Sequence, residues 1–300
     1  MPDPLHVVLA GASGLIGSAL DRSLRAEGHR VTQLVRREPS ASNEVRWDPA
    51  GGVLDATALR GADVAVCLSG AGVADRRWTE RYKRLLVSSR VEGVGLLART
   101  LAAMDDGPRV FLAASAVGFY GDTGEQTVDE SAPAGSGFLA DLCVQWEAAT
   151  APAAAAGVRV ANLRTGLLLS SDGGLLARLR PIVKLGVGGR IGSGEQFMSP
   201  ISMADEIAAI RFLMSADVSG PVNLTGPDPV RNKDFVRELA ALLHRPAVLP
   251  APGFALRAVL GEIAGDALTG QRAIPAKLQA AGFAFQHPDL ASALRWALGH

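Results

Sequence analysis

The sequence predicts an α/β protein with a doubly wound parallel sheet and a smaller, mixed C-terminal lobe. Through the first half of the chain, short apolar runs alternate with longer amphipathic segments, and this alternation is typical of β-α-β units. The short runs are apolar at successive positions rather than at every second one. Continuous apolarity indicates strands that are covered by helices on both faces, as in parallel sheets.

The predicted strands of the first half are rich in valine, leucine and alanine: VVLA, VTQLV, ADVAVCLSG, RVFLAASA and VRVANLR. Helix-like segments separate several of these runs, and the predicted helices are Leu15 to Ala26, Thr79 to Ala103 and Phe138 to Ala156. This order of elements favours one doubly wound sheet.

After Arg164 the pattern changes, which predicts a second lobe. A glycine-rich stretch, LGVGGRIGSGEQ, precedes the helical pattern MADEIAAIRFLMSA and the strand-like run PVNLTG. Proline residues then separate helix candidates near Lys233–Leu243, Phe254–Ala264 and Pro288–Leu298. We expect residues 1–168 to form the first domain, with 200–226 returning to it, and 169–199 with 227–300 to form the C-terminal lobe.

Composition argues against several classes of protein. Lysine plus arginine equals aspartate plus glutamate, 30 each, so no overall charge attracts nucleic acid or an anionic membrane. The N-terminal apolar run is too short for a signal peptide, and no other apolar stretch reaches membrane length. A cytoplasmic protein is therefore expected. Cys67 and Cys143 lie in apolar sequence, which predicts buried free thiols, and the five histidines lack the spacing of a metal site.

A glycine-spaced loop follows the first predicted strand, in the stretch HVVLAGASGLIGSAL. In G-x-x-G-x-x-G spacing, the first glycine permits a tight turn, the second lets backbone N–H groups approach a pyrophosphate, and the third lets the helix pack on the sheet. The helix N-terminus also favours an anion. The sequence thus predicts a dinucleotide site in a Rossmann sheet, and the residues expected at the cofactor are Gly11, Ser13, Gly14, Leu15, Ile16 and Gly17.

The second predicted strand, VTQLV, ends in Arg36 and Arg37. An NAD-selective site usually carries an acidic residue at this point, whereas a guanidinium suits a 2′-phosphate. The pair therefore predicts NADP(H) as the cofactor. The alternative is a solvated basic pair with no ligand.

A series of motifs extends over nearly the whole chain: GASGLIG at Gly11, VRWDP at Val45, LSGAGVADRRW at Leu68, SSRVEG at Ser88, SAVGFYG at Ser115, GFLADLCVQWE at Gly137, LRTGLLLS at Leu163, IGSGEQF at Ile191 and GQRAIPAKLQAAGFAF at Gly270. With these motifs the chain resembles an atypical extended short-chain dehydrogenase/reductase. The resemblance points to the NAD-dependent epimerase/dehydratase-like (nucleoside-diphosphate-sugar epimerase-like) subgroup, which has its own C-terminal segment.

The resemblance implies further contacts with the cofactor. Leu68, Ser69 and Gly70 stand at the position of the family's segment that passes under the adenosine ribose and phosphates of the cofactor. Arg90 stands where extended members usually carry asparagine, so it would reach the cofactor or a substrate anion, unless it forms a surface salt bridge. Leu168 falls where the superfamily lines the nicotinamide pocket.

Arg76, Arg77 and Trp78 form a second constellation. Two arginines beside an aromatic ring would seat an anionic, planar or phosphorylated group, so Arg77 and Trp78 are predicted to bind substrate. The alternative is a surface patch ahead of the predicted helix. That helix lies where superfamily members often pair, so a homodimer is also expected. The glycine-rich stretch from Gly186 to Gly194 lacks a G-K-[ST] sequence and is interpreted as a loop bordering the substrate cleft.

The proton donor that the resemblance implies is a tyrosine whose pKa is lowered by a lysine four residues on. Neither Tyr82 nor Tyr120 has that lysine. Leu139 and Cys143 stand at approximately the positions of the pair.

Ser115, at the end of RVFLAASA, stands where the superfamily places its helper hydroxyl, and Tyr120 follows on the loop that leaves the strand. Our hypothesis is that Ser115 polarises a substrate carbonyl and Tyr120 is the acid, with a cation such as Arg77 in place of the lysine. The alternative is that both are structural. The expected function is that of an NADP(H)-dependent oxidoreductase or epimerase that acts on a small polar substrate. Phosphorylated and nucleotide-linked compounds are among the substrates considered. A redox sensor or regulatory protein that binds NADPH without turnover is the competing hypothesis.

Overall fold

The computed structural model describes residues 3–184, 188–246, 262, 265 and 268–299. Its centre is an eight-stranded sheet with the order β12-β8-β6-β5-β1-β2-β3-β4, parallel except for the pairing of β3 with β4. The strands are β1 (His6–Ala10), β2 (Arg30–Val35), β3 (Glu44–Asp48), β4 (Val53–Leu54), β5 (Val64–Cys67), β6 (Val110–Ala116), β8 (Arg159–Thr165) and β12 (Gly220–Leu224). The five strands predicted from the first half of the chain are confirmed.

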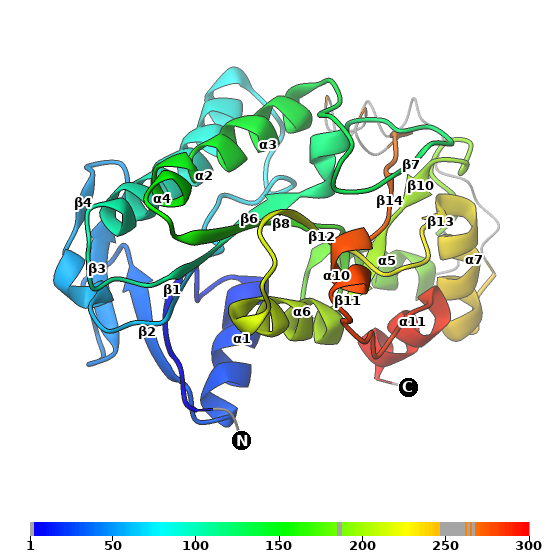
Figure 1. Ribbon diagram of the computed structural model, residues 1–300. Helices are drawn as coiled ribbons and strands as arrows, with labels where there is room; N and C mark the ends of the chain where they lie inside the picture. Colours follow the sequence, from blue (N-terminus) through cyan, green and yellow to red (C-terminus); the bar gives the residue numbers. More distant parts are fainter. Residues whose placement is uncertain (1–2, 185–187, 247–261, 263–264, 266–267, 300) are drawn as a thin grey trace.

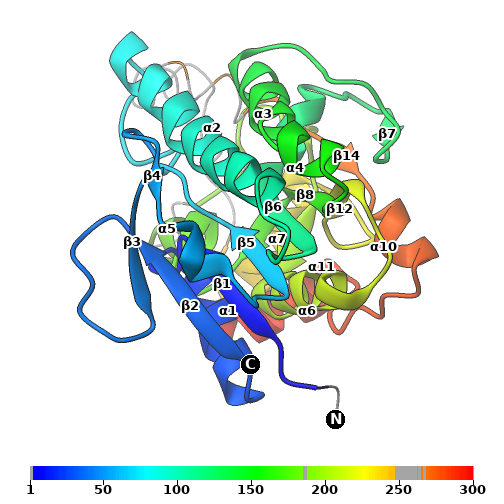
Figure 2. The ribbon, with the colours of Figure 1, turned by 60° about the vertical axis from the view of Figure 1, so that its left-hand side comes forward.

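Helices cover both faces of the sheet, which confirms the doubly wound fold (Figures 1 and 2). One face carries α2 (Glu80–Ala102), α3 (Phe138–Ala148) and α4 (Ala151–Ala155), and the other carries α1 (Leu15–Ala26) and α6 (Met203–Ser215). All five residues of β1 are buried. Its side chains alternate between two apolar layers, one under each set of helices, and this is why the strand sequence shows no polar alternation.

The single helix predicted from Phe138 to Ala156 is wrong. The structure ends α3 at Ala148 and starts α4 at Ala151, with Pro152 in the first turn of α4. Proline lacks the N–H that would continue the helix, and its ring would clash with the carbonyl four residues earlier. Proline is tolerated in a first turn, so a new helix begins there.

Beyond β8 the chain builds the mixed C-terminal part, seen to the right in Figure 1. Its elements are β9 (Leu167–Leu169), α5 (Gly174–Lys184), β10 (Phe197–Met198), β11 (Pro200–Ser202), β13 (Val230–Arg231), α7 (Asn232–Leu242), β14 (Arg272–Ala273), α10 (Ala276–Ala280) and α11 (Leu290–Leu298). Strand β14 pairs with β7 (Thr127–Val128) from the first half of the chain. Helices α5, α7 and α11 share a small apolar core that includes Leu176, Phe235 and Leu294.

Two of the predicted C-terminal helices are confirmed as α7 and α11, and the one near Phe254–Ala264 lies outside the described residues. The run PVNLTG contributes β12, which pairs in parallel with β8 at the edge of the main sheet. The division into a cofactor domain and a substrate lobe stays a prediction. Both cysteines are buried free thiols, as expected.

Within the described residues, no helix has the length and apolarity needed to span a bilayer. In the same part of the chain, no group of histidine, cysteine, aspartate and glutamate side chains is arranged to hold a metal ion.

Candidate functional site

The glycine loop joins β1 to α1 at the carboxyl end of the sheet. Gly11 has φ of +87°, and a Cβ there would lie 2.7 Å from the carbonyl carbon of Leu68. A Cβ on Gly17 would lie 2.1 Å from the carbonyl oxygen of Gly11. Neither position can therefore hold a side chain without moving backbone atoms.

Gly14 has a different role, because a Cβ there would meet only the Gly11 oxygen, at 3.3 Å. Gly14 is the N-cap of α1, and no side chain caps the helix. The first-turn N–H groups of a helix have no acceptor within the helix, so those of α1 remain for a ligand. A turn that needs glycine, together with an uncapped helix N-terminus, fits the pyrophosphate of a dinucleotide.

The two arginines that follow β2 differ in their surroundings. Arg37 donates from Nη1 to Glu44 Oε2 at 2.8 Å and from Nη2 to Glu44 Oε1 at 2.5 Å. This pairing lowers the pKa of Glu44 to about 2. Arg36 is exposed and has no hydrogen-bond or ion-pair partner among the residues that the structure describes. Arg36 is thus free to pair with an anion, and its contact with a 2′-phosphate stays a prediction, while Arg37 orders the loop before β3.

The segment after β5 is supported by hydrogen bonds with β1 and α2. The Leu68 N–H donates to the Ala10 carbonyl at 2.9 Å, and Ser69 Oγ lies 3.3 Å from Cys67 Sγ. Arg90 donates from Nη2 to the Ala71 carbonyl at 2.8 Å. Ser69 and Gly70 are therefore positioned by contacts on both sides of the segment.

Arg90 is only 7% exposed, so it forms no surface salt bridge. Its guanidinium lies 5.0 Å from the centre of the Trp146 ring, and burial lowers its pKa. A Cβ on Gly70 would lie 3.2 Å from the Arg90 Cζ. The structure thus places this cation directly against the predicted cofactor segment, although its contact with a cofactor stays a prediction. Leu168 lies in β9, paired in register with Ile201 of β11, and its nicotinamide contact is equally a prediction.

Ser115 and Tyr120 belong to one network of hydrogen bonds. Ser115 Oγ donates to Glu147 Oε1 at 2.7 Å. Arg164 holds both oxygens of Glu147, from Nε at 2.8 Å and Nη2 at 2.9 Å, and donates from Nη1 to the Tyr120 hydroxyl at 2.9 Å. The Tyr120 hydroxyl in turn donates to Asn223 Oδ1 at 2.7 Å. The carboxylate and the guanidinium therefore link the two predicted hydroxyls.

This network is largely covered by protein, since Ser115 and Tyr120 are each 4% exposed. Burial raises the pKa of Tyr120, and the hydrogen bond from Arg164 only partly opposes this effect. Tyr120 is therefore a protonated phenol at neutral pH. It can give a proton but does not readily exist as a phenolate.

Trp78 and Arg77, the two residues predicted to bind substrate, have different surroundings in the structure. Trp78 is buried, its Nε1 donates to the Val73 carbonyl at 2.9 Å, and its ring packs edge-on against Phe138 with centres 5.0 Å apart. Arg77 instead lines a cavity of about 430 Å³ at the start of α2, together with Arg76 and Arg81. Trp78 supports this segment, and substrate binding by Arg77 and Trp78 stays a prediction.

Glu206 is a buried acid that the sequence did not single out. It lies in the first turn of α6, and its Oε1 accepts a hydrogen bond from Thr165 Oγ1 at 2.8 Å. Its Oε2 is buried with no partner among the described residues. Burial raises the pKa of Glu206 to about 8, so the side chain is mainly protonated at pH 7.

Comparison with known proteins gives the family. The model of the NAD dependent epimerase/dehydratase family matches residues 7–224. An epimerase family protein of Mycobacterium bovis is 47% identical over 293 residues, which covers 97% of each chain. The chain belongs to the NAD-dependent epimerase/dehydratase family. A model of a domain of unknown function also matches residues 251–297.

Other members of the epimerase/dehydratase family support this assignment over the full chain. The crystal structure of human epimerase family protein SDR39U1 (isoform 2) with NADPH is 30% identical and superposes with a TM-score of 0.89, covering 99% of this chain and 100% of that chain. A chloroplastic SDR39U1 homolog of Arabidopsis thaliana is 34% identical over 300 residues, 97% of this chain and 86% of that protein. The resemblance drawn from the sequence motifs is confirmed.

Leu139 and Cys143, the residues at approximately the positions where the sequence resemblance implies a tyrosine–lysine pair, both lie on α3, and Glu147 follows one turn later. Burial raises the pKa of Cys143 to about 11, so it carries no charge at neutral pH. The cation that contacts Tyr120 is Arg164 from β8, whereas we had expected one such as Arg77. A charged residue near the end of an apolar strand was the sequence signal for Arg164.

Proposed function

We propose that the protein is an NADP(H)-dependent oxidoreductase or epimerase that acts on a small polar substrate at the carboxyl edge of the sheet. The observation that carries the proposal is the unpaired Arg36, one strand away from an uncapped glycine turn. The first-turn N–H groups of α1 would bind the pyrophosphate, and Arg36 would bind the 2′-phosphate. The bound cofactor would supply or accept a hydride.

We expect Arg36→Ala to weaken NADPH binding by about 10- to 100-fold, the scale of a lost charge-assisted hydrogen bond. NADH affinity should change by less than about threefold, because NADH has no 2′-phosphate. Fluorescence titration of both nucleotides with the unaltered protein and the variant measures this. Arg37→Ala is the matched control, since Arg37 is held by Glu44. An equal loss for both nucleotides, or none for either, would contradict the assignment.

For the chemistry, we propose that Ser115 polarises a substrate carbonyl and that Tyr120 supplies the proton. Arg164, 2.9 Å from the Tyr120 hydroxyl, takes the place of the missing lysine, because a cation stabilises the phenolate that forms as the proton leaves. The arginines at the start of α2 favour a phosphorylated or nucleotide-linked substrate. The homodimer and the cytoplasmic location stay predictions.

Tyr120→Phe should lower the turnover number by about 100-fold or more, the usual scale for loss of a general acid. NADPH affinity should stay unchanged, since the hydroxyl faces Arg164 and Asn223. Turnover is measured as oxidation of NADPH by a carbonyl substrate. Tyr82→Phe is the control, because the Tyr82 hydroxyl donates to the Gly72 carbonyl outside the network. Full activity of Tyr120→Phe would exclude the tyrosine as the acid.

A second function is favoured by one observation: both predicted catalytic hydroxyls are buried and hydrogen-bonded. A protein that binds NADPH as a redox sensor or regulator needs no acid within reach of a substrate. Such a protein would show the Arg36 effect on binding but would transfer no hydride.

A further inference from the structure

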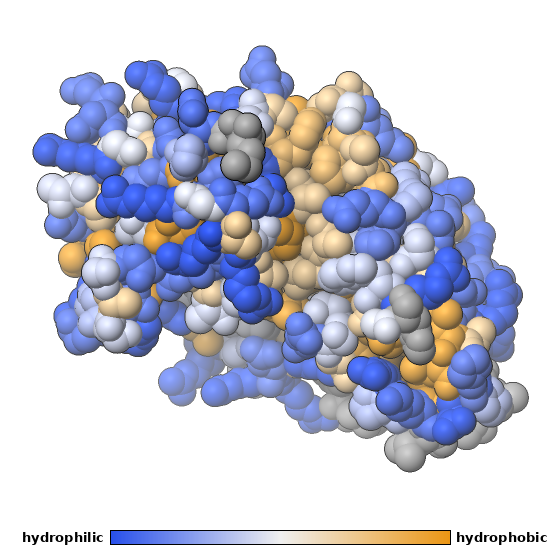
Figure 3. Space-filling view, turned by 90° about the horizontal axis from the view of Figure 1, so that it is seen from below, coloured by the Kyte–Doolittle hydropathy of each residue, from blue (hydrophilic) through white to orange (hydrophobic). Residues whose placement is uncertain are grey.

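A cavity of about 930 Å³ lies between α1, α6, the loop after β9 and the C-terminal end of α11. Helices α1, α6 and α11 lie at the lower side of Figure 1, and Figure 3 shows the molecule from that side. Ser13, Gly14 and Leu15 of the glycine loop line the cavity, but Arg36 and Ser69 do not. The cavity therefore overlaps the predicted cofactor site at the glycine loop and extends away from Arg36 and Ser69.

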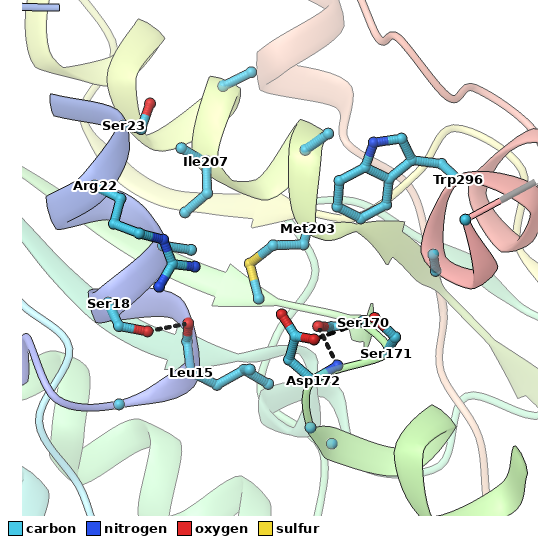
Figure 4. Close-up of a pocket in the computed structure, with 18 of the residues that line it drawn as sticks. Leu15, Ser18, Arg22, Ser23, Ser170, Ser171, Asp172, Met203, Ile207 and Trp296 are labelled. Carbon is cyan, nitrogen blue, oxygen red and sulfur yellow. Dashed lines mark hydrogen bonds between the residues drawn. The ribbon is translucent and has the colours of Figure 1, made fainter. Parts of the chain in front are cut away.

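One part of the cavity wall is apolar. Leu15 of α1 and both Met203 and Ile207 of α6 contribute side chains, and Trp296 of α11 stands on the far side (Figure 4). Trp296 is 41% exposed, while the other three tryptophans are buried. An exposed indole beside a methionine is suited to a flat apolar group, because both side chains offer polarisable contact surface.

The charged residues of the cavity favour an anion. Arg22 and Arg180 both line it, and neither has a hydrogen-bond or ion-pair partner within the part of the chain that the structure describes. The Nε of Arg180 is buried with no partner among the described residues, so an anion in the cavity would pair with the terminal nitrogens of this side chain. Arg211 also lines the cavity but is paired with Glu27.

Asp172 is the acidic residue among those that line the cavity, and it accepts a hydrogen bond from Ser171. Figure 4 shows Arg22 pointing from α1 into the cavity on the side of Asp172. Because Arg211 is paired with Glu27, Arg22 and Arg180 against Asp172 leave the cavity with an excess of positive charge.

From this combination we propose that the cavity is a second binding site, for a small organic anion in which a phosphate or carboxylate is joined to a flat apolar group. The anion pairs with Arg22 and Arg180, and the flat group lies against Trp296 and Met203. The volume is within the range of small-molecule sites, about 300–1,000 Å³. Because the site shares Ser13 and Gly14 with the glycine loop, its ligand would lie next to the cofactor without replacing it.

The test uses 1-naphthyl phosphate as the probe and the full-length protein saturated with NADPH. Binding is followed by calorimetry and by quenching of Trp296 fluorescence, with Trp296→Phe to identify the quenched residue. We expect saturable binding that Arg22→Gln and Arg180→Gln each weaken by about tenfold, as for loss of a charge-assisted contact. The neutral analogue 1-naphthol should bind more weakly than the phosphate.

Matched controls lie on the same two helices. Arg25→Gln on α1 and Arg178→Gln on α5 remove the same charge from residues that are outside the cavity and paired with Asp21 and Asp75. Both control variants should bind the probe as the unaltered protein does. Binding of the probe to the NADPH-free protein but not to the NADPH-saturated protein would assign the cavity to the cofactor site and overturn the proposal. An equal loss in the control variants, or no loss in Arg22→Gln and Arg180→Gln, would overturn the proposal.

Discussion

Replacement of Glu147 by glutamine is expected to lower the free energy of unfolding by about 3–5 kcal/mol, the usual cost of removing one partner from a buried ion pair. Glu147 accepts two hydrogen bonds from Arg164, whose side chain is 3% exposed, and one from Ser115. Without the carboxylate, the guanidinium keeps its charge in a buried site with no compensating anion. Urea-induced unfolding measures the difference.

Glu38→Gln is the matched control, since Glu38 pairs with Arg46 on the surface and exposed pairs contribute about 1 kcal/mol or less. A double variant, Glu147→Gln with Arg164→Gln, should recover part of the loss because it also removes the unpaired charge. If Glu147→Gln costs no more than Glu38→Gln, the network is not the buried ion pair described above.

The second large effect concerns pH. The pKa of Glu206 in the folded chain is raised from 4.5 to about 8 by burial. Between these two pH values the folded chain keeps a proton that the unfolded chain has released. Glu206 therefore makes the protein less stable as the pH rises from 5 to 9, by up to about 4–5 kcal/mol at 1.36 kcal/mol per pH unit.

Glu206→Gln removes this dependence while keeping the shape of the side chain and the acceptor for Thr165. Its free energy of unfolding should match that of the unaltered protein at about pH 4 and exceed it by about 4–5 kcal/mol at pH 9. Urea unfolding at a series of pH values checks this, with the exposed Glu92→Gln as the control. A constant difference between Glu206→Gln and the unaltered protein across the series would contradict the prediction.

The fold could be predicted largely because its strands are buried on both faces, so β1, β5 and β6 appear in the sequence as unbroken apolar runs. Strand β3, with the sequence EVRWD, lacks such a run and was missed. Strands of two or three residues, such as β10 and β13, depend on a partner distant in the sequence. The break between α3 and α4 could have been predicted from Pro152.

The site was predictable where function depends on backbone geometry, as at Gly11 and Gly17. Spacing along the chain does not determine which of two adjacent arginines is already paired, so Arg36 and Arg37 could not be distinguished. The contact of Arg164 with Glu147 joins a strand to a helix, and only the packed sheet brings these residues together. Trp78 was predicted at the substrate because an aromatic residue beside arginines has the same sequence pattern whether it is buried or exposed.

The most direct test of the proposed function follows deuterium from NADPH labelled at C4 of the nicotinamide. The protein is incubated with NADPH that carries deuterium on one face of C4 and, separately, on the other face, together with a panel of small aldehydes, ketones and phosphorylated or nucleotide-linked keto sugars. The deuterium content of the products is measured by mass spectrometry. An NADP(H)-dependent oxidoreductase or epimerase transfers deuterium from one face to at least one carbonyl carbon. Bound NADPH with no deuterium in any product would contradict that function and favour a sensor or regulatory protein.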